Sequence, residues 1–140
     1  MWGINMSNMK FSYIRNPEKK RDVTIVSNIF YVDEKPFIEY GYSFRSNHDV
    51  FKKKEGRKFA TQRMVSRDSK YSGVISIDTI THNRIMSGIL IKILENSEHI
   101  PKKFLIDIEE KLSYYDSAHY SKTMKTLLLR KIALKMNQKQ

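Results

Sequence analysis

The 140-residue sequence contains no cysteine, which excludes disulfides, thiolate nucleophiles, iron–sulfur clusters and cysteine-based zinc sites. It has only three prolines and five glycines, and no linker rich in Pro, Gly or Ser interrupts it. The longest apolar segment, around Ile89 to Leu94, is short and contains Lys92. The first residues also lack the basic and apolar regions of a signal peptide. We therefore expect a folded cytoplasmic protein with no membrane span.

Motifs for catalysis are also scarce. The four histidines, His48, His82, His99 and His119, are scattered, and none has a companion at metal-ligand spacing. The sequence has no Walker A loop, no GxGxxG and no GxSxG. We predict no catalytic residues, no metal site, no cofactor and no enzymatic activity. Acid–base chemistry on a phosphodiester, with His48 or His82 as the base, stays open as an alternative.

Positive charge is what the sequence has in excess, with a formal net charge of +11. Two segments carry most of it. Residues 52–70 contain eight Lys or Arg and two acids, and residues 122–140 contain six Lys or Arg and no acid. Such localised basic segments attract phosphate-rich ligands through their summed potential. An anionic nucleotide or a nucleic acid is therefore the expected partner.

Hydrophobic periodicity predicts an α+β fold in a single domain of residues 1–140. Alternating apolar residues predict four antiparallel strands, at 9–15, 23–32, 37–45 and 73–79. In the third strand, the alternation predicts one packed and one partly wet face. A basic helix packed on this sheet precedes the fourth strand, so that residues 9–80 form the sheet part, and residues 1–8 are expected to be disordered.

Residues 83–137 are expected to form a helical C-terminal half. Asn83 is the expected cap of its first helix, and Pro101 lies in the first turn of the next. Residues 107–110 are expected on a solvated outer face. The last helix, residues 117–136, has a broad apolar surface, through which we expect a homo-oligomer to form.

The basic helix centres on the segment Phe51–Met64. Its expected packed face consists of Gly56, Phe59, Ala60 and Met64, where the glycine allows close approach to the sheet. The other face carries like charges four residues apart, which repel each other in an isolated helix. A bound polyanion would compensate for this repulsion, while a solvated face offset by Glu55 and salt is the alternative.

The arginines of the basic helix predict phosphate binding more specifically than its lysines do, because a guanidinium binds phosphate bidentately. Arg57 and Arg63 are the main candidates, and Arg45 and Asn47 are expected near the N-terminus of the helix, which favours anions. The full predicted ligand-binding set is Arg45, Asn47, Lys53, Lys54, Arg57, Lys58 and Arg63. Strand aromatics are expected in the core first, with base stacking as an alternative role; they are Tyr13, Tyr31, Tyr40, Tyr42 and Phe44.

An aromatic strand that leads into the segment 51–64 resembles the Thoeris anti-defence sponge family of small bacteriophage proteins. The resemblance covers about residues 23–64, and the matching positions are Gly56, Arg57, Ala60 and Arg63. The sequence departs from the family pattern at Lys52, Gln62 and Met64, and the loop before the helix lacks the usual proline.

The resemblance implies a non-enzymatic counter-defence protein that forms oligomers and sequesters a cyclic nucleotide signal in the host cytoplasm. The alternative function is a nucleic-acid-binding regulator, or an inhibitor of a host defence or transcription complex. Two separated basic segments fit an extended polymer better than a small ligand.

Overall fold

A computed structural model describes residues 9–46, 53–116 and 132–136. Contacts divide the chain into two compact units, residues 1–78 and residues 79–140. The boundary falls close to the end predicted for the sheet part, and the single domain stays a prediction. The two units are described separately.

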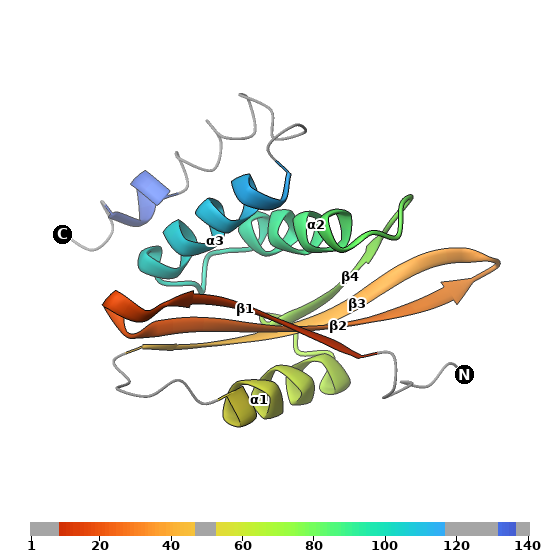
Figure 1. The fold of residues 1–140 in the computed structure, drawn as a ribbon, viewed down its shortest axis with the longest axis horizontal. Coiled ribbons are helices and arrows are strands. Elements are labelled where there is room, and N and C mark those ends of the chain that lie inside the picture. The colour runs from red at the N-terminus through yellow and green to blue at the C-terminus, as the bar shows by residue number, and fades with distance from the viewer. Residues whose placement is uncertain (1–8, 47–52, 117–131, 137–140) are drawn as a thin grey trace. The chain divides into compact units, whose positions relative to one another are not determined.

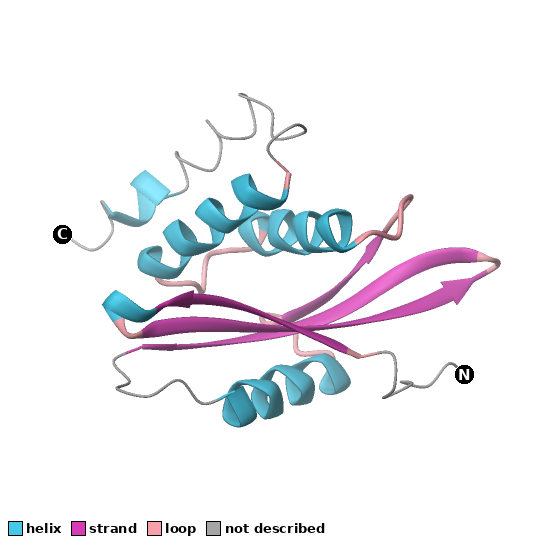
Figure 2. Ribbon diagram, in the orientation of Figure 1, coloured by secondary structure: helices cyan, strands magenta, loops and turns pink. Residues whose placement is uncertain are grey.

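The first unit is built on one four-stranded antiparallel sheet with the strand order β1-β2-β3-β4. Figures 1 and 2 show this sheet and the helix α1 that lies on one of its faces. The element bounds are β1 Lys10–Asn16, the 3₁₀ turn η2 Pro17–Lys19, β2 Arg21–Val32, β3 Lys35–Ser46, α1 Lys53–Ser66 and β4 Ser72–Ser76. This architecture confirms the α+β prediction, although β4 ends at Ser76 and not at Thr79.

Local turn chemistry sets the register of the two hairpins. Between β1 and β2, the side chain of Asn16 accepts a hydrogen bond from the amide of Lys19, and Lys20 closes the turn with a left-handed backbone. Between β2 and β3, Asp33 and Glu34 have φ values of 50° and 67°, as in the tight turns that match strand twist. The register of β2 against β3 then pairs Val26 with Gly41.

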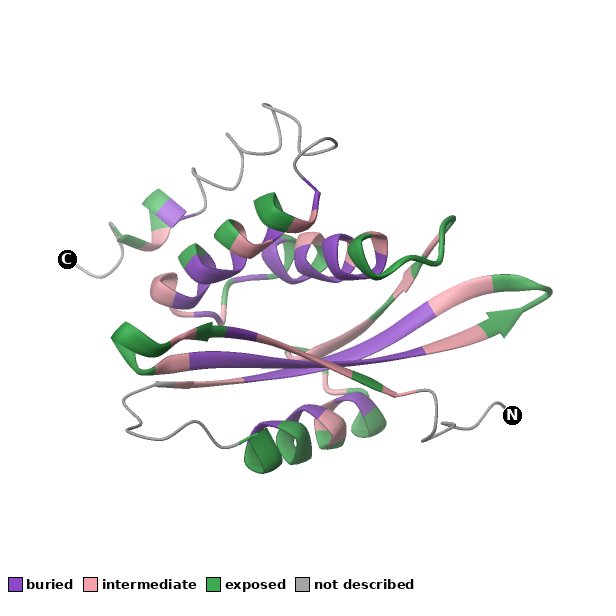
Figure 3. Cartoon of the chain, viewed as in Figure 1, coloured by how far each residue is buried: buried purple, intermediate pink, exposed green. Residues whose placement is uncertain are grey.

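Helix α1 packs on the sheet through small residues. A Cβ atom on Gly41 of β3 would collide with backbone atoms of Ala60 and Met64, and one on Gly56 would collide with Thr24. Gly56, Ala60 and Met64 are the buried residues of α1, and its other side is exposed (Figure 3). The prediction for Phe59 was wrong: its side chain is 46% exposed, because the buried stripe follows the four-residue spacing 56–60–64.

The sheet face under α1 is unusually polar. Thr24, Asn28, Glu39 and Ser43 are all buried, and the amide of Asn28 donates a 3.1 Å hydrogen bond to the Glu39 carboxylate. The partly wet face that the alternation in β3 predicts is therefore buried, since α1 lies on it. The apolar cluster of Val26, Ala60 and Met64, close backbone contact and the hydrogen bond from Ser43 together hold α1 in place.

The second unit contains α2 His82–Glu95 and α3 Lys102–Tyr115, which pack against each other. The buried residues of both helices are mostly apolar. The cap of α2 is Thr81 and not Asn83, because the Thr81 hydroxyl accepts a hydrogen bond from the amide of Arg84. Asp107 is buried and not on the predicted solvated face.

Most of the predicted final helix, residues 117–136, lies outside the described residues. The part of it that the structure describes, residues 132–136, is helical. Within the described ranges, no helix is long and apolar enough to cross a membrane.

Candidate functional site

The N-terminal turn of α1 is anchored to β3, which places the basic segment beside the sheet. The Ser43 hydroxyl donates a 3.1 Å hydrogen bond to the carbonyl oxygen of Gly56. One residue before that glycine, Glu55 accepts a 3.1 Å hydrogen bond from Arg45. These contacts turn the cationic residues of α1 toward β1 and solvent.

Arg45 lies in a charge-compensated cluster. Its guanidinium contacts Asp22 at 3.3 Å and Glu55 at 3.1 Å, and its side chain is only 9% exposed. Asp22 and Arg45 are direct cross-strand partners in the sheet. The structure therefore places Arg45 at the N-terminal end of the helix, as predicted, but with two carboxylates around its charge. Arg45 therefore holds α1 against the sheet, and its compensated charge is little available to a ligand.

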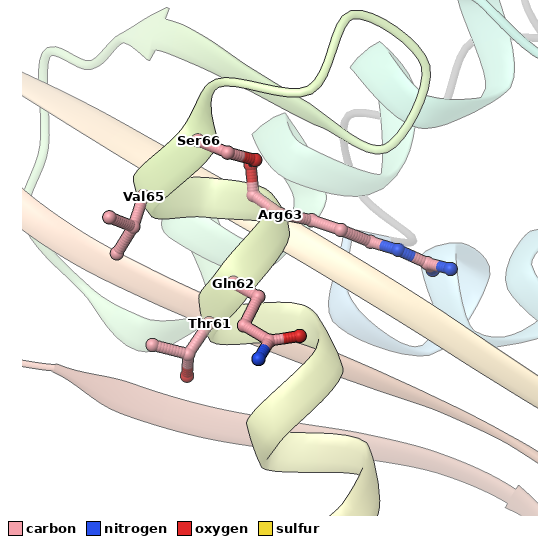
Figure 4. A pocket seen from close by; sticks show the side chains of 5 residues that line it. All are labelled: Thr61, Gln62, Arg63, Val65 and Ser66. Atoms are coloured by element: carbon pink, nitrogen blue, oxygen red, sulfur yellow. The ribbon is translucent and has the colours of Figure 1, made fainter.

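Arg63 is bound within the protein at the other end of α1. Its Nη1 donates a 2.9 Å hydrogen bond to the carbonyl oxygen of Tyr42, and its guanidinium lies 4.1 Å from the ring centroid of Tyr71. Figure 4 shows the Arg63 side chain directed away from Thr61 and Val65. A pocket at this end of α1 is lined by Thr61, Gln62, Arg63, Val65 and Ser66, all from this one helix.

The loop from α1 to β4 is built around the same contacts. The Asp68 carboxylate accepts hydrogen bonds from the amides of Lys70 at 2.8 Å and Tyr71 at 2.9 Å, which lowers its pKa. The Tyr42 hydroxyl donates a 2.9 Å hydrogen bond to the carbonyl oxygen of Lys70. Burial raises the pKa of Tyr42 well above its usual range, so this hydroxyl stays protonated and keeps its role as donor.

Arg57 and Lys53 lie over β1. The Nε of Arg57 donates a 2.5 Å hydrogen bond to the Tyr13 hydroxyl, and its guanidinium is 5.1 Å from the Phe11 ring centroid. Lys53 Nζ lies 5.3 Å from the centroid of Tyr13. Both cations remain exposed. The contacts of Arg57 and Lys53 with β1 were not predicted from the sequence. The alternation in β1, which puts residues 11 and 13 on one face, could have indicated that their rings face the helix.

Lys54 and Lys58 complete the exposed side of the helix. Together with Lys53 and Arg57 they form what we call the basic patch. Within the described part of the chain, no carboxylate lies within ion-pair distance of any of these four cations. Their i,i+4 repulsion is therefore not relieved by a described acidic partner.

The remaining predicted residues do not join this patch. Asn47 lies outside the described residues. Tyr40 and Tyr42 are buried, in line with the core role that the sequence favoured for them. Tyr31 is exposed near the β2–β3 turn. Among residues that the structure describes, no three His, Asp or Glu side chains form a group that could hold a metal ion.

Comparisons with protein-family models, with curated proteins and with solved structures gave no significant match.

Proposed function

We propose that this protein binds the phosphates of a nucleic acid through the basic patch, without acting chemically on its ligand. The observation that carries the proposal is the contrast between two groups of cations. Arg45 and Arg63 are only partly exposed, and their guanidiniums are held by carboxylates or by a carbonyl oxygen and a ring. The four cations of the basic patch are exposed on one helix, although Arg57 also donates a hydrogen bond to Tyr13, and no described carboxylate pairs with them.

The shape of the patch favours a polymer. Lys54 and Lys58 are one turn apart, about 6 Å along the axis, so α1 presents a row of charges on an open helix surface. A polyanion that lies along this row can contact several cations at once. Each phosphate contact releases a condensed counterion, which makes the affinity depend steeply on salt.

A small nucleotide is the second candidate, and a specific contact favours it. Arg57 uses its Nε for Tyr13, which leaves the two terminal nitrogens of the guanidinium to bind a phosphate bidentately. Lys53 lies on the same tyrosine ring. This compact pair supports sequestration of a cyclic nucleotide, the role that the family resemblance implies.

A titration against duplex DNA, RNA and a cyclic dinucleotide at several salt concentrations tests both candidates. For a polymer in the basic patch, we expect log K to fall with log salt with a slope of about −3 to −4. The double variant Lys54→Gln/Lys58→Gln should reduce the slope by about 2. The matched control, Lys35→Gln/Lys92→Gln, removes two exposed charges elsewhere and should change the slope little.

The outcomes separate the candidates. Failure of every polymer to bind at 50 mM salt, or a Lys54→Gln/Lys58→Gln variant with unchanged affinity and slope, would refute the nucleic-acid proposal. Tight binding of the cyclic dinucleotide with weak salt dependence would favour sequestration instead. In that case Arg57→Lys, which keeps the charge but removes the bidentate geometry, should weaken binding by at least tenfold.

A further inference from the structure

A cluster of aromatic and basic side chains lies in the second unit, where α2 begins and α3 ends. The ring of His82, the first residue of α2, meets Tyr115 edge to face at 5.5 Å between centroids. Tyr115 in turn meets Tyr114 edge to face at 5.5 Å. Three rings from two helices are thus joined in one continuous group.

A cation belongs to the same group. Lys111 Nζ lies 4.8 Å from the centroid of Tyr114 and 5.3 Å from that of Tyr115. Tyr114 is nevertheless 74% exposed, and His82 is exposed as well. A single exposed ring is common on protein surfaces, but here the exposed rings of Tyr114 and His82 are grouped with Tyr115 and a lysine.

The backbone around the cluster is well held. Arg84 forms a 3.7 Å ion pair with Asp116, which connects the first turn of α2 to the end of α3. The amide of Asp116 donates a 3.0 Å hydrogen bond to the carbonyl oxygen of Leu112, a fully buried residue. The backbone that carries the rings is therefore held in place, which lowers the entropic cost of binding a ligand to them.

Exposed rings beside a cation match the chemistry of one ligand class. Proteins that bind single strands stack the bases on aromatic side chains and contact the backbone with basic ones. In a duplex the base faces are already stacked on each other and are not accessible. We infer that His82, Lys111, Tyr114 and Tyr115 form a stacking platform for the bases of single-stranded nucleic acid. This inference rests on the nucleic-acid function proposed above.

The test compares single strands with duplex in the full-length protein. For Tyr114→Ala, we expect affinity for oligo(dT) and oligo(U) to fall by about 5- to 150-fold, the usual effect of removing one stacking ring. Affinity for duplex DNA should change less than twofold. Tyr114→Phe keeps the ring and should bind single strands almost as the wild type does. Because Tyr114 is exposed, all of these variants should fold, which circular dichroism checks.

A second readout reports stacking directly. In a Trp2→Phe background, Tyr114→Trp leaves one tryptophan in the chain, and its fluorescence should be quenched by oligo(dT) but not by duplex DNA. An unquenched signal, or a Tyr114→Ala variant within twofold of wild type on both single strands, would overturn the platform.

The two proposals fail in different ways. If Lys54→Gln/Lys58→Gln weakens binding while Tyr114→Ala does not, the platform is refuted and the function of the basic patch stands. If the wild type binds neither single strands nor duplex, both are refuted.

Discussion

Gly41→Ala is expected to displace the helix that carries the basic patch. The added Cβ would lie 2.6 Å from the Met64 amide nitrogen and 2.8 Å from the Met64 Cβ, and it would also collide with the carbonyl oxygen of Ala60. Two of these three atoms belong to the backbone of α1, so no side-chain rotation relieves the contact. The helix has to move away from β3.

The expected magnitude follows from two opposing effects. Overpacking by one methyl group typically costs about 1–3 kcal/mol. Alanine in place of glycine within a strand contributes about 0.5–1 kcal/mol in the other direction, because the unfolded chain loses freedom. Because the collision is with the backbone of α1, we expect the overpacking cost in the upper part of its range, at about 2–3 kcal/mol. The net loss is then about 1–2 kcal/mol, which corresponds to a decrease in Tm of roughly 3–8 °C for a chain of this size.

Urea denaturation followed by circular dichroism measures this loss. The matched control is Gly73→Ala in β4, where the new Cβ would meet the Tyr40 hydroxyl at 2.5 Å and its Cζ at 2.8 Å. Although Tyr40 is buried, these atoms lie at the far end of its side chain and not in the backbone of a helix, so we expect a smaller change. A Gly41→Ala protein as stable as wild type, or less affected than Gly73→Ala, would show that α1 does not pack on β3 as closely as the structure indicates.

Two further predictions concern the other end of α1. Arg63→Ala should destabilise the fold by about 1–3 kcal/mol, because it removes the hydrogen bond to Tyr42 and the contact with Tyr71. The control, Lys54→Ala, should change the free energy of unfolding by no more than about 0.5 kcal/mol. Equal effects of the two substitutions in chemical denaturation would contradict the structural role of Arg63. Asp68 has a pKa lowered from its ordinary 3.8 by hydrogen bonds from the amides of Lys70 and Tyr71, so its ionised form contributes stability above about pH 4 that is lost as the pH falls through the folded pKa. Asp68→Asn should therefore be less stable than wild type at pH 7, and the difference should shrink at pH 3; a difference that is independent of pH would refute this role.

Much of the first unit could be predicted from the sequence, because its signals are local. Period-two alternation located all four strands to within a few residues, and Gly56, Ala60 and Met64 marked the packed side of α1. Phe59 was misplaced because apolar character alone does not say how narrow the buried stripe is. Thr81 was missed as the cap of α2 because neighbouring Thr and Asn both suit that position, and only the backbone geometry distinguishes them.

The candidate site was harder to predict than the fold. By itself, the sequence determined where the positive charge is concentrated, that thiol chemistry is excluded, and which side of the basic helix faces solvent. Only the tertiary structure decided which cations are already engaged: the sheet register places Asp22 beside Arg45, and the loop after α1 brings Tyr71 under Arg63. The physical reason is that the effective charge of an arginine depends on partners that are distant along the chain. Helical spacing predicts which side chains of a helix share a face, but it does not predict which side chains from the rest of the fold contact them.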